Sequence, residues 1–129
     1  MDYPAPVERH FNHPSNVGPL AAAALPVVRG EAGSAAAGAW VVFEAEIAGE
    51  SVRRLAFRAF GCPYLIAACS RATEQLAGTQ ASAASRFDPA ALAQELSVPA
   101  EKLGSLLILQ DALRNCFRDW DTTQPAGAR

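Results

Sequence analysis

The stretch AFRAFGCPYLIAACSRATEQLAG, Ala56–Gly78, predicts a β-strand that ends at a glycine and continues as an α-helix. Apolar residues and arginines alternate before the break, which is typical of a strand with one buried face. After the break, apolar residues recur at helical spacing. Pro63 is favoured in the first turn of a helix because it has no N–H group to lose there, and Gly78 fits the residue that ends the helix. Cys62 is therefore predicted at the N-cap, between strand and helix.

Cys62 would combine a thiol with the N-terminal end of a helix. The free N–H groups of the first helical turn favour a thiolate over a thiol. A thiolate can act as a nucleophile, carry a persulfide or bind a metal ion. The alternative is a buried capping residue that packs against the preceding strands. The residues around Cys62 leave both interpretations open.

The sequence before this stretch predicts the other strand of a β-hairpin. Apolar and acidic residues alternate along 41–47, apolar residues and arginines alternate along 54–59, and a loop is expected at Ala48–Val52. The predicted register pairs Phe43 with Phe57 and Ala45 with Leu55 on the core face. The other face is expected to be exposed, with Glu46 opposite Arg54, and to carry Glu44, Glu46, Arg54 and Arg58.

The rest of the chain predicts mainly helices around this hairpin. The expected elements are a short helix at Tyr3–Phe11, an edge strand at Pro26–Val28, a loop at Gly30–Gly38, and helices at Asp88–Leu96 and from Ala100 or Glu101 to Trp120. This order favours an α+β fold with a small antiparallel sheet of about three strands, covered on one face by helices. The chain has 129 residues, of which 50% are hydrophobic, so we expect a single domain at 1–129 with a flexible tail at 122–129.

Composition and charge exclude several classes of function. The net charge is −2, and the 11 basic residues form no cationic stripe, so nucleic-acid binding is disfavoured. We expect no membrane span and no export signal, because the apolar runs are short and the first residues carry acidic side chains. Three cysteines at unrelated spacings suit a reducing compartment rather than a disulfide framework. The expected location is the cytoplasm.

The other reactive side chains predict no second site. Cys69 and Cys116 lie on apolar stripes of two predicted helices and are interpreted as small buried hydrophobic residues. No Gly-rich motif for phosphate binding is present. The remaining candidates have neither a third metal ligand nor an acid–base partner, and they are interpreted as structural or exposed residues: His10, His13, Glu74 and Asp111.

Three segments of the sequence resemble one family. His10–Gly18 reads HFNHPSNVG, similar to a His-aromatic-x-x-Pro-x-Asn-Val-Gly segment, and Phe57–Gly78 contains a Phe-Gly-Cys junction followed by Ala-Thr-Glu. Val98–Leu113 is similar in framework to a segment that holds a chaperone-recognition motif. Together they resemble the IscU/NifU-type iron–sulfur cluster assembly scaffolds, from Tyr3 to about Asp119. The resemblance implies an IscU/SufE-like fold and a scaffold protein rather than an enzyme.

The resemblance also implies which residues would hold a cluster. In that family three cysteines bind the cluster, helped by an aspartate and a histidine. The corresponding positions in this chain are Ala37, Ala39, Cys62, Gly104 and Ser105, so only Cys62 remains. A [2Fe–2S] cluster needs four ligands, normally thiolates with some histidine. The implied cofactor is an iron–sulfur cluster or iron, with Cys62 as the sole remaining ligand.

Two functions are compatible with this set of residues. In the first, Cys62 accepts a persulfide from a cysteine desulfurase, or remains a cluster ligand, and the chain works with other cluster assembly proteins. In the second, the chain is a non-catalytic binding module that regulates the assembly machinery without binding a cluster. The chaperone-recognition motif corresponds to Val98–Lys102, where Glu101 replaces an apolar residue, which counts against chaperone docking. The sequence leaves open whether residues 21–38 form a lid over Cys62.

Overall fold

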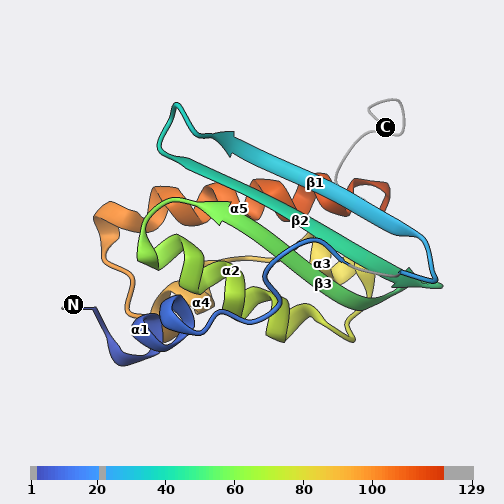
Figure 1. Cartoon of the computed structure of the whole chain (residues 1–129), viewed down its shortest axis with the longest axis horizontal. Helices are drawn as coiled ribbons and strands as arrows, with labels where there is room; N and C mark the ends of the chain where they lie inside the picture. The colour runs from blue at the N-terminus through green and yellow to red at the C-terminus, as the bar shows by residue number, and fades with distance from the viewer. Residues whose placement is uncertain (1–2, 21–22, 121–129) are drawn as a thin grey trace.

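The computed structural model describes residues 3–20 and 23–120, and its centre is a three-stranded antiparallel β-sheet (Figure 1). The strands are β1 at Val27–Ser34, β2 at Ala39–Ala48 and β3 at Ser51–Phe60. Each strand pairs with the next one in the chain, so the sheet is a simple meander in the order β1-β2-β3. The predicted α+β class with a sheet of about three strands is confirmed.

Helices cover one face of the sheet (Figure 1). α2 at Pro63–Leu76 packs against β3, and α5 at Leu103–Cys116 packs against β1 and β2. The other helical segments are α1 at Ala5–Asn12, α3 at Ala81–Ser85, α4 at Ala90–Glu95, and the 3-10 turns η1 at Ala100–Lys102 and η2 at Arg118–Trp120. α1 packs on α2. Within the described ranges, no helix is long and apolar enough to cross a membrane.

The predicted register of the hairpin is confirmed. The pairs are Phe43 with Phe57, Ala45 with Leu55, and Glu46 with Arg54. The four apolar side chains of these pairs are buried in the core, as the alternation predicted. The strands extend into the predicted loop at Ala48–Val52, so the turn itself consists of Gly49 and Glu50.

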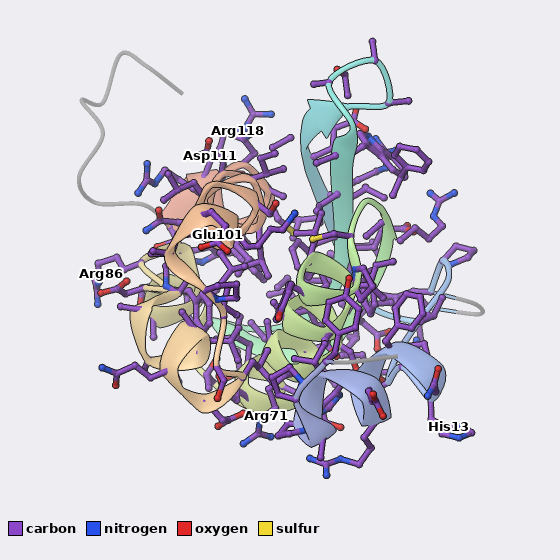
Figure 2. All side chains as sticks on the ribbon, turned by 90° about the vertical axis from the view of Figure 1, so that its left-hand side faces the viewer. His13, Arg71, Arg86, Glu101, Asp111 and Arg118 are labelled. Atoms are coloured by element: carbon purple, nitrogen blue, oxygen red, sulfur yellow. The ribbon has the colours of Figure 1, made fainter. Side chains whose placement is uncertain are left out.

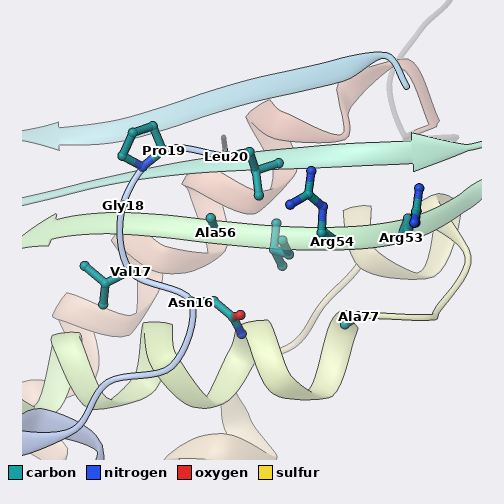
Figure 3. A pocket seen from close by; sticks show the side chains of 10 residues that line it. Asn16, Val17, Gly18, Pro19, Leu20, Arg53, Arg54, Ala56 and Ala77 are labelled. Carbon is teal, nitrogen blue, oxygen red and sulfur yellow. The ribbon is translucent and has the colours of Figure 1, made fainter. Parts of the chain in front are cut away.

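The prediction that Glu46 lies on an exposed face is wrong. Its side chain is 1% exposed because Ala24 and Leu25 contact it on the outer face of the sheet; Figure 3 shows Asn16–Leu20, on the same face, passing across β3. Glu46 Oε2 accepts hydrogen bonds from the backbone N–H groups of Ala24 and Leu25, at 3.1 and 3.3 Å. Glu46 Oε1 accepts one from Arg54 Nε at 2.8 Å. The other predicted members of this face are half-buried or exposed: Glu44, Arg54 and Arg58.

The contacts of Glu46 also affect its protonation. The hydrogen bond from Arg54 lowers the pKa of Glu46, and this effect exceeds the opposing effect of burial. Because folding lowers this pKa, the carboxylate stabilises the fold at neutral pH. That contribution is lost as the pH falls through the folded-state pKa of Glu46.

β1 is longer than the predicted edge strand at Pro26–Val28. It continues through half of the stretch predicted to be a loop at Gly30–Gly38, and only residues 35–38 form a turn. Because residues 27–34 pair with β2, they do not form a lid over Cys62. Residues 21–22 of the suggested lid and the predicted tail at 122–129 lie outside the described residues.

The helices differ from the prediction mainly at their ends. α2 begins at Pro63 after Cys62, and Gly78 follows its end with a φ of 87°, as predicted. α4 begins two residues after Asp88, whose Oδ1 accepts a hydrogen bond from the Ala90 N–H group at 3.0 Å. The last predicted helix is divided into η1, α5 and η2, and α3 was not predicted.

Candidate functional site

Cys62 occupies the predicted N-cap position between β3 and α2. Its backbone is extended, with φ −73° and ψ 163°, and its carbonyl oxygen accepts hydrogen bonds from the N–H groups of Leu65 and Ile66 at 3.1 and 3.2 Å. The side chain is half-buried, and it makes no capping hydrogen bond. The thiol is therefore partly open to solvent at the start of a 14-residue helix.

Gly61 fixes the position of this thiol. It has a φ of 155°, and a Cβ atom at this position would lie 2.7 Å from Leu65 Cδ2 and 3.7 Å from Ala39 Cβ. A residue with a side chain would rarely adopt this φ, and it would force the Leu65 side chain to shift. The glycine lets the chain turn from β3 into α2, at a point where Gly61 lies close to the start of β2.

Sequence-distant segments meet at the end of the molecule that holds Cys62. The turn between β1 and β2, the junction between β3 and α2, and the start of α5 all lie at this end (Figure 1). Ala37 is exposed in the turn and Ala39 is buried at the start of β2, while Gly104 is exposed and Ser105 half-buried in the first turn of α5. The fold thus brings the positions implied by the family resemblance to one end of the molecule.

The chemistry of these positions does not suit a metal cluster. Apart from Cys62, they offer two alanines, a glycine and a serine hydroxyl, which is a hard and weakly acidic ligand. In residues 3–20 and 23–120, no group of three or more His, Cys, Asp or Glu side chains could hold a metal ion. One thiolate cannot complete the four-ligand shell of a [2Fe–2S] cluster. The residues present therefore do not fit a cluster held by this chain alone.

The other two cysteines are buried, as predicted. Burial raises the pKa of the Cys69 thiol well above its usual range. Burial, with a smaller effect from Glu44, raises the pKa of Cys116 to about 12. Both thiols are therefore protonated and shielded near neutral pH, and Cys62 is the one accessible thiol in the chain.

The difference in exposure among the three cysteines predicts how many of them react with an alkylating reagent. At pH 7.5 we expect iodoacetamide to modify one thiol rapidly in the folded wild-type chain and three thiols in urea, because unfolding removes the shielding of Cys69 and Cys116. Intact-mass spectrometry over time measures the count. Cys62→Ser should leave the folded chain without a fast thiol. Slow modification of folded wild type would instead support a shielded Cys62 without reactivity.

His10 and Glu74 have structural partners, whereas His13 is exposed. His10 is buried, and its Nδ1 lies 2.8 Å from Ser70 Oγ, which also accepts a hydrogen bond from the Ser15 N–H group at 2.8 Å. Glu74 Oε2 accepts a hydrogen bond from Ser15 Oγ at 2.6 Å, and this bond lowers the pKa of Glu74. His13 is exposed and points away from the body of the molecule (Figure 2). These contacts hold α1 and the loop after it on α2.

Sequence reasoning missed the roles of Ser70 and Thr73 in this polar cluster. Asn16 Nδ2 donates to Thr73 Oγ1 at 2.9 Å, and Thr73 Oγ1 donates to the Ser70 carbonyl at 2.7 Å. Ser70, Thr73 and Glu74 are three and four residues apart, so they lie on one face of α2. Polar residues at this spacing within the otherwise apolar stripe of α2 were the signal that could have revealed the cluster. Because the HFNHPSNVG segment supplies the partners of these residues, it is a structural motif in this chain.

Loss of this cluster should lower stability. Ser70 is fully buried, and Ser70→Ala would leave the Ser15 N–H group without its acceptor, at a cost of about 1–3 kcal/mol in the free energy of unfolding. Urea denaturation followed by circular dichroism measures this change. Gln75→Ala, on the exposed side of the same helix, should change stability by less than about 0.5 kcal/mol. Equal effects of the two substitutions would show that the cluster is not structural.

The segment at Val98–Lys102 leads into α5. Ala100, Glu101 and Lys102 are exposed and form η1, so a charged side chain stands where the chaperone-recognition motif has an apolar one. Figure 2 shows Glu101 and Asp111 on the outer side of this part of the molecule. Asp111 is exposed.

The chain is similar to proteins named for iron–sulfur cluster assembly. "Iron sulfur cluster assembly protein 1" of Trachipleistophora hominis is 30% identical over 120 residues, which cover 93% of this chain and 87% of that protein. "Iron-sulfur cluster assembly scaffold protein IscU" of Rickettsia prowazekii is 31% identical over 121 residues, which cover 93% of this chain and 92% of that protein.

A solved structure and a family model agree with these relatives. The N-terminal part of a nitrogen-fixing NifU-like protein from Brucella abortus has the same fold, with a TM-score of 0.65 at 18% identity over 91% of this chain and 92% of that one. The model of the family described as NifU-like N-terminal domain matches residues 2–126. Because this match spans nearly the whole sequence, the chain belongs to the family of NifU-like N-terminal domains.

Proposed function

We propose that the protein acts as a scaffold-like protein of iron–sulfur cluster assembly and that Cys62 is its persulfide acceptor. Family membership supports the scaffold role, because relatives that match nearly the whole chain are named as cluster assembly proteins and as scaffolds. The observation that carries the proposal for Cys62 is its position. It is the one partly exposed thiol, it caps a helix N-terminus, and the family's cluster residues correspond to the same end of the fold.

The sulfur transfer needs no oxidant. The Cys62 thiolate attacks the outer sulfur of a persulfide on the donor protein, which we propose to be a cysteine desulfurase. A new S–S bond forms at Cys62, the S–S bond of the donor breaks, and the donor cysteine leaves as a thiolate. The N–H groups at the start of α2 form the partly positive end of the helix dipole, beside which an anionic persulfide on Cys62 would be placed.

The chain is proposed to handle sulfur as cargo rather than to hold a complete cluster by itself. Ala37, Ala39, Gly104 and Ser105 leave Cys62 without further strong ligands. Ligands for an iron–sulfur cluster would have to come from a partner in the assembly machinery. The absence of paired cysteines in the described structure supports a reducing compartment, and we propose the cytoplasm.

Transfer from a desulfurase tests this function. After anaerobic incubation with cysteine and the cysteine desulfurase of the same organism, wild type should gain the mass of one sulfur atom. Cys62→Ser should gain none, because the other thiols are buried. Cys116→Ala is the matched control, since it removes a buried thiol and should still accept sulfur. The proposal fails if Cys62→Ser accepts as much sulfur as wild type.

The second candidate is a binding module that regulates the assembly machinery without sulfur or cluster chemistry. It is favoured by the replacement of four family positions with residues that bind metal weakly or not at all. Under this function, wild type and Cys62→Ser bind the desulfurase with equal affinity, and neither gains sulfur. Titration calorimetry with both chains, alongside the mass measurement, separates the two functions.

A further inference from the structure

An irregularity in β3 places two arginines on its outer face. Val52 and Leu55 are both buried in the core, yet they lie three positions apart, whereas the side chains of a regular strand alternate between two faces. The pairing of β2 with β3 shifts register at the same place, where Arg53 has no partner residue in β2. This β-bulge directs Arg53 and Arg54 to the same side of β3, as Figure 3 shows.

The two arginines line a hollow between β3 and the loop that crosses it (Figure 3). The hollow has a volume of about 250 Å³, and its other walls come from residues 16–20, from Leu55 and Ala56, and from Ala77 at the end of α2. No acidic side chain is among the described residues that line it. The hollow lies beside the end of α2, whereas Cys62 lies at the start of this helix. It is therefore a separate site with two positive charges in its wall.

Glu46 does not satisfy the side chain of Arg53. Both carboxylate oxygens of Glu46 already accept hydrogen bonds, Oε1 from Arg54 Nε at 2.8 Å and Oε2 from two backbone N–H groups. Arg53 Nη1 lies 4.0 Å from Glu46 Oε1, which is too far for a hydrogen bond. No other described residue accepts a hydrogen bond from Arg53. One buried carboxylate thus faces two guanidinium groups, and the N–H donors of Arg53 stay available to a ligand.

The backbone of Leu55 offers further hydrogen-bonding groups in the same hollow. On either side of it, the outer edge of β3 is paired: Phe57 exchanges hydrogen bonds with Asn16 and Gly18 at 3.0 and 2.9 Å, and Val52 does so with the segment after α2 at 2.8 and 2.7 Å. Because alternate residues of a strand direct their backbone groups to the same edge, those of Leu55 point outward like those of Phe57. No described residue pairs with them. Unpaired backbone groups at a buried residue are rare, and they indicate a place where water or a ligand binds.

We propose that this hollow binds a small anion, a carboxylate or a phosphate. Oxygen atoms of the anion accept hydrogen bonds from the Arg53 side chain and from the Leu55 N–H group, two donors that line the hollow without acceptors of their own. The planar guanidinium group matches both carboxylate and phosphate oxygens. The hollow has room for a molecule of several non-hydrogen atoms, because one water molecule takes about 30 Å³ in the liquid. The site is independent of sulfur transfer at Cys62.

Titration of the isotope-labelled chain with malonate and, separately, with inorganic phosphate tests this site by NMR. Added chloride keeps the ionic strength constant, so that the general screening of surface charge does not change. We expect the backbone amide signal of Leu55 to shift and to saturate with a Kd of about 1 mM, because the contacts are few. Saturation by malonate alone assigns a carboxylate ligand, and saturation by phosphate alone assigns a phosphate ligand. An amide signal of Leu55 that shifts with neither anion up to about 50 mM overturns the proposal.

Two variants separate the role of Arg53 from the general charge of the sheet. Arg53→Gln removes the charge and should weaken the binding at least about 10-fold. Arg58→Gln is the matched control, because Arg58 is an exposed arginine of the same strand that does not line the hollow, and it should bind the anion as wild type does. Far-ultraviolet circular dichroism checks that both variants are folded. Equal binding by Arg53→Gln and wild type overturns the proposal, and so does an equal loss in the two variants.

Discussion

Gly30→Ala should strongly destabilise the protein. The Cα atom of Gly30 faces the last turn of α5, and a Cβ atom there would collide with the backbone N and Cα of Cys116 and lie 2.5 Å from the carbonyl carbon of Asn115. Backbone atoms cannot rotate away as a side chain can. The helix would have to move off the strand, at a cost of about 3 kcal/mol in the free energy of unfolding.

Gly104→Ala is the matched control for this prediction. Gly104 lies in α5, and a Cβ atom there would meet nothing within 4 Å. Alanine is the better helix former, so this variant should be more stable than wild type by about 0.5–1 kcal/mol. Urea denaturation of the three proteins measures both changes. A Gly30→Ala protein as stable as wild type would contradict the close approach of α5 to β1.

Restoring the missing ligands should give the chain a cluster. In the variant Ala37→Cys/Gly104→His/Ser105→Cys, three cysteines and a histidine would be present at the positions that hold a cluster in the resembling scaffolds. Ala39 is kept because it is only 9% exposed, and burying a carboxylate there would be costly. After anaerobic reconstitution with ferrous iron and sulfide, we expect this variant to be coloured and to bind iron, whereas wild type stays colourless.

Cys62→Ser in the background of that variant is the control. It leaves three of the four ligands and should lose most of the bound iron, because a serine hydroxyl is a poor substitute for a thiolate. Visible absorbance and bound-iron content give two independent readings. A wild type that binds as much iron as the restored variant would mean that the chain holds a cluster with ligands other than those at the family positions.

The parts of the fold that were predicted correctly depend on local patterns. The alternation along β2 and β3 determined which faces meet, and the Glu46 and Arg54 pair fixed the register. The helix after Cys62 followed from Pro63 and from the spacing of apolar residues. In each case the deciding residues lie within a few positions of one another or in directly paired strands.

The errors arise where distant segments make contact. Glu46 was expected on an exposed face, and its burial comes from Ala24 and Leu25, more than 20 residues earlier in the chain. β1 was predicted to be short because glycine is unfavourable in strands, yet Gly30 is there so that α5 can approach. Neither contact leaves a periodic signal in the sequence.

The candidate site was predicted unevenly for a related reason. The location of Cys62 follows from a local motif, whereas the proximity of the preceding Gly61 to Ala39 depends on how β2 and β3 pair. In the polar cluster, Ser70 contacts Ser15 and His10, which lie 55 and 60 residues earlier in the chain. From the sequence alone, His10 could be recognised only as a residue without enough neighbouring ligands for a metal site. Its structural partner, Ser70, could not be identified.

The most direct test of the central claim is to locate the sulfur on unmodified wild type. The folded chain is treated anaerobically with a small-molecule persulfide, trapped with an alkylating reagent and digested, and fragment spectra distinguish Cys62 from Cys69. We predict the added sulfur on Cys62 and on no other cysteine, because only this thiol is accessible. Sulfur on Cys69 or Cys116 in the folded chain, or an unmodified Cys62, would contradict the role of Cys62 as the sulfur-accepting residue.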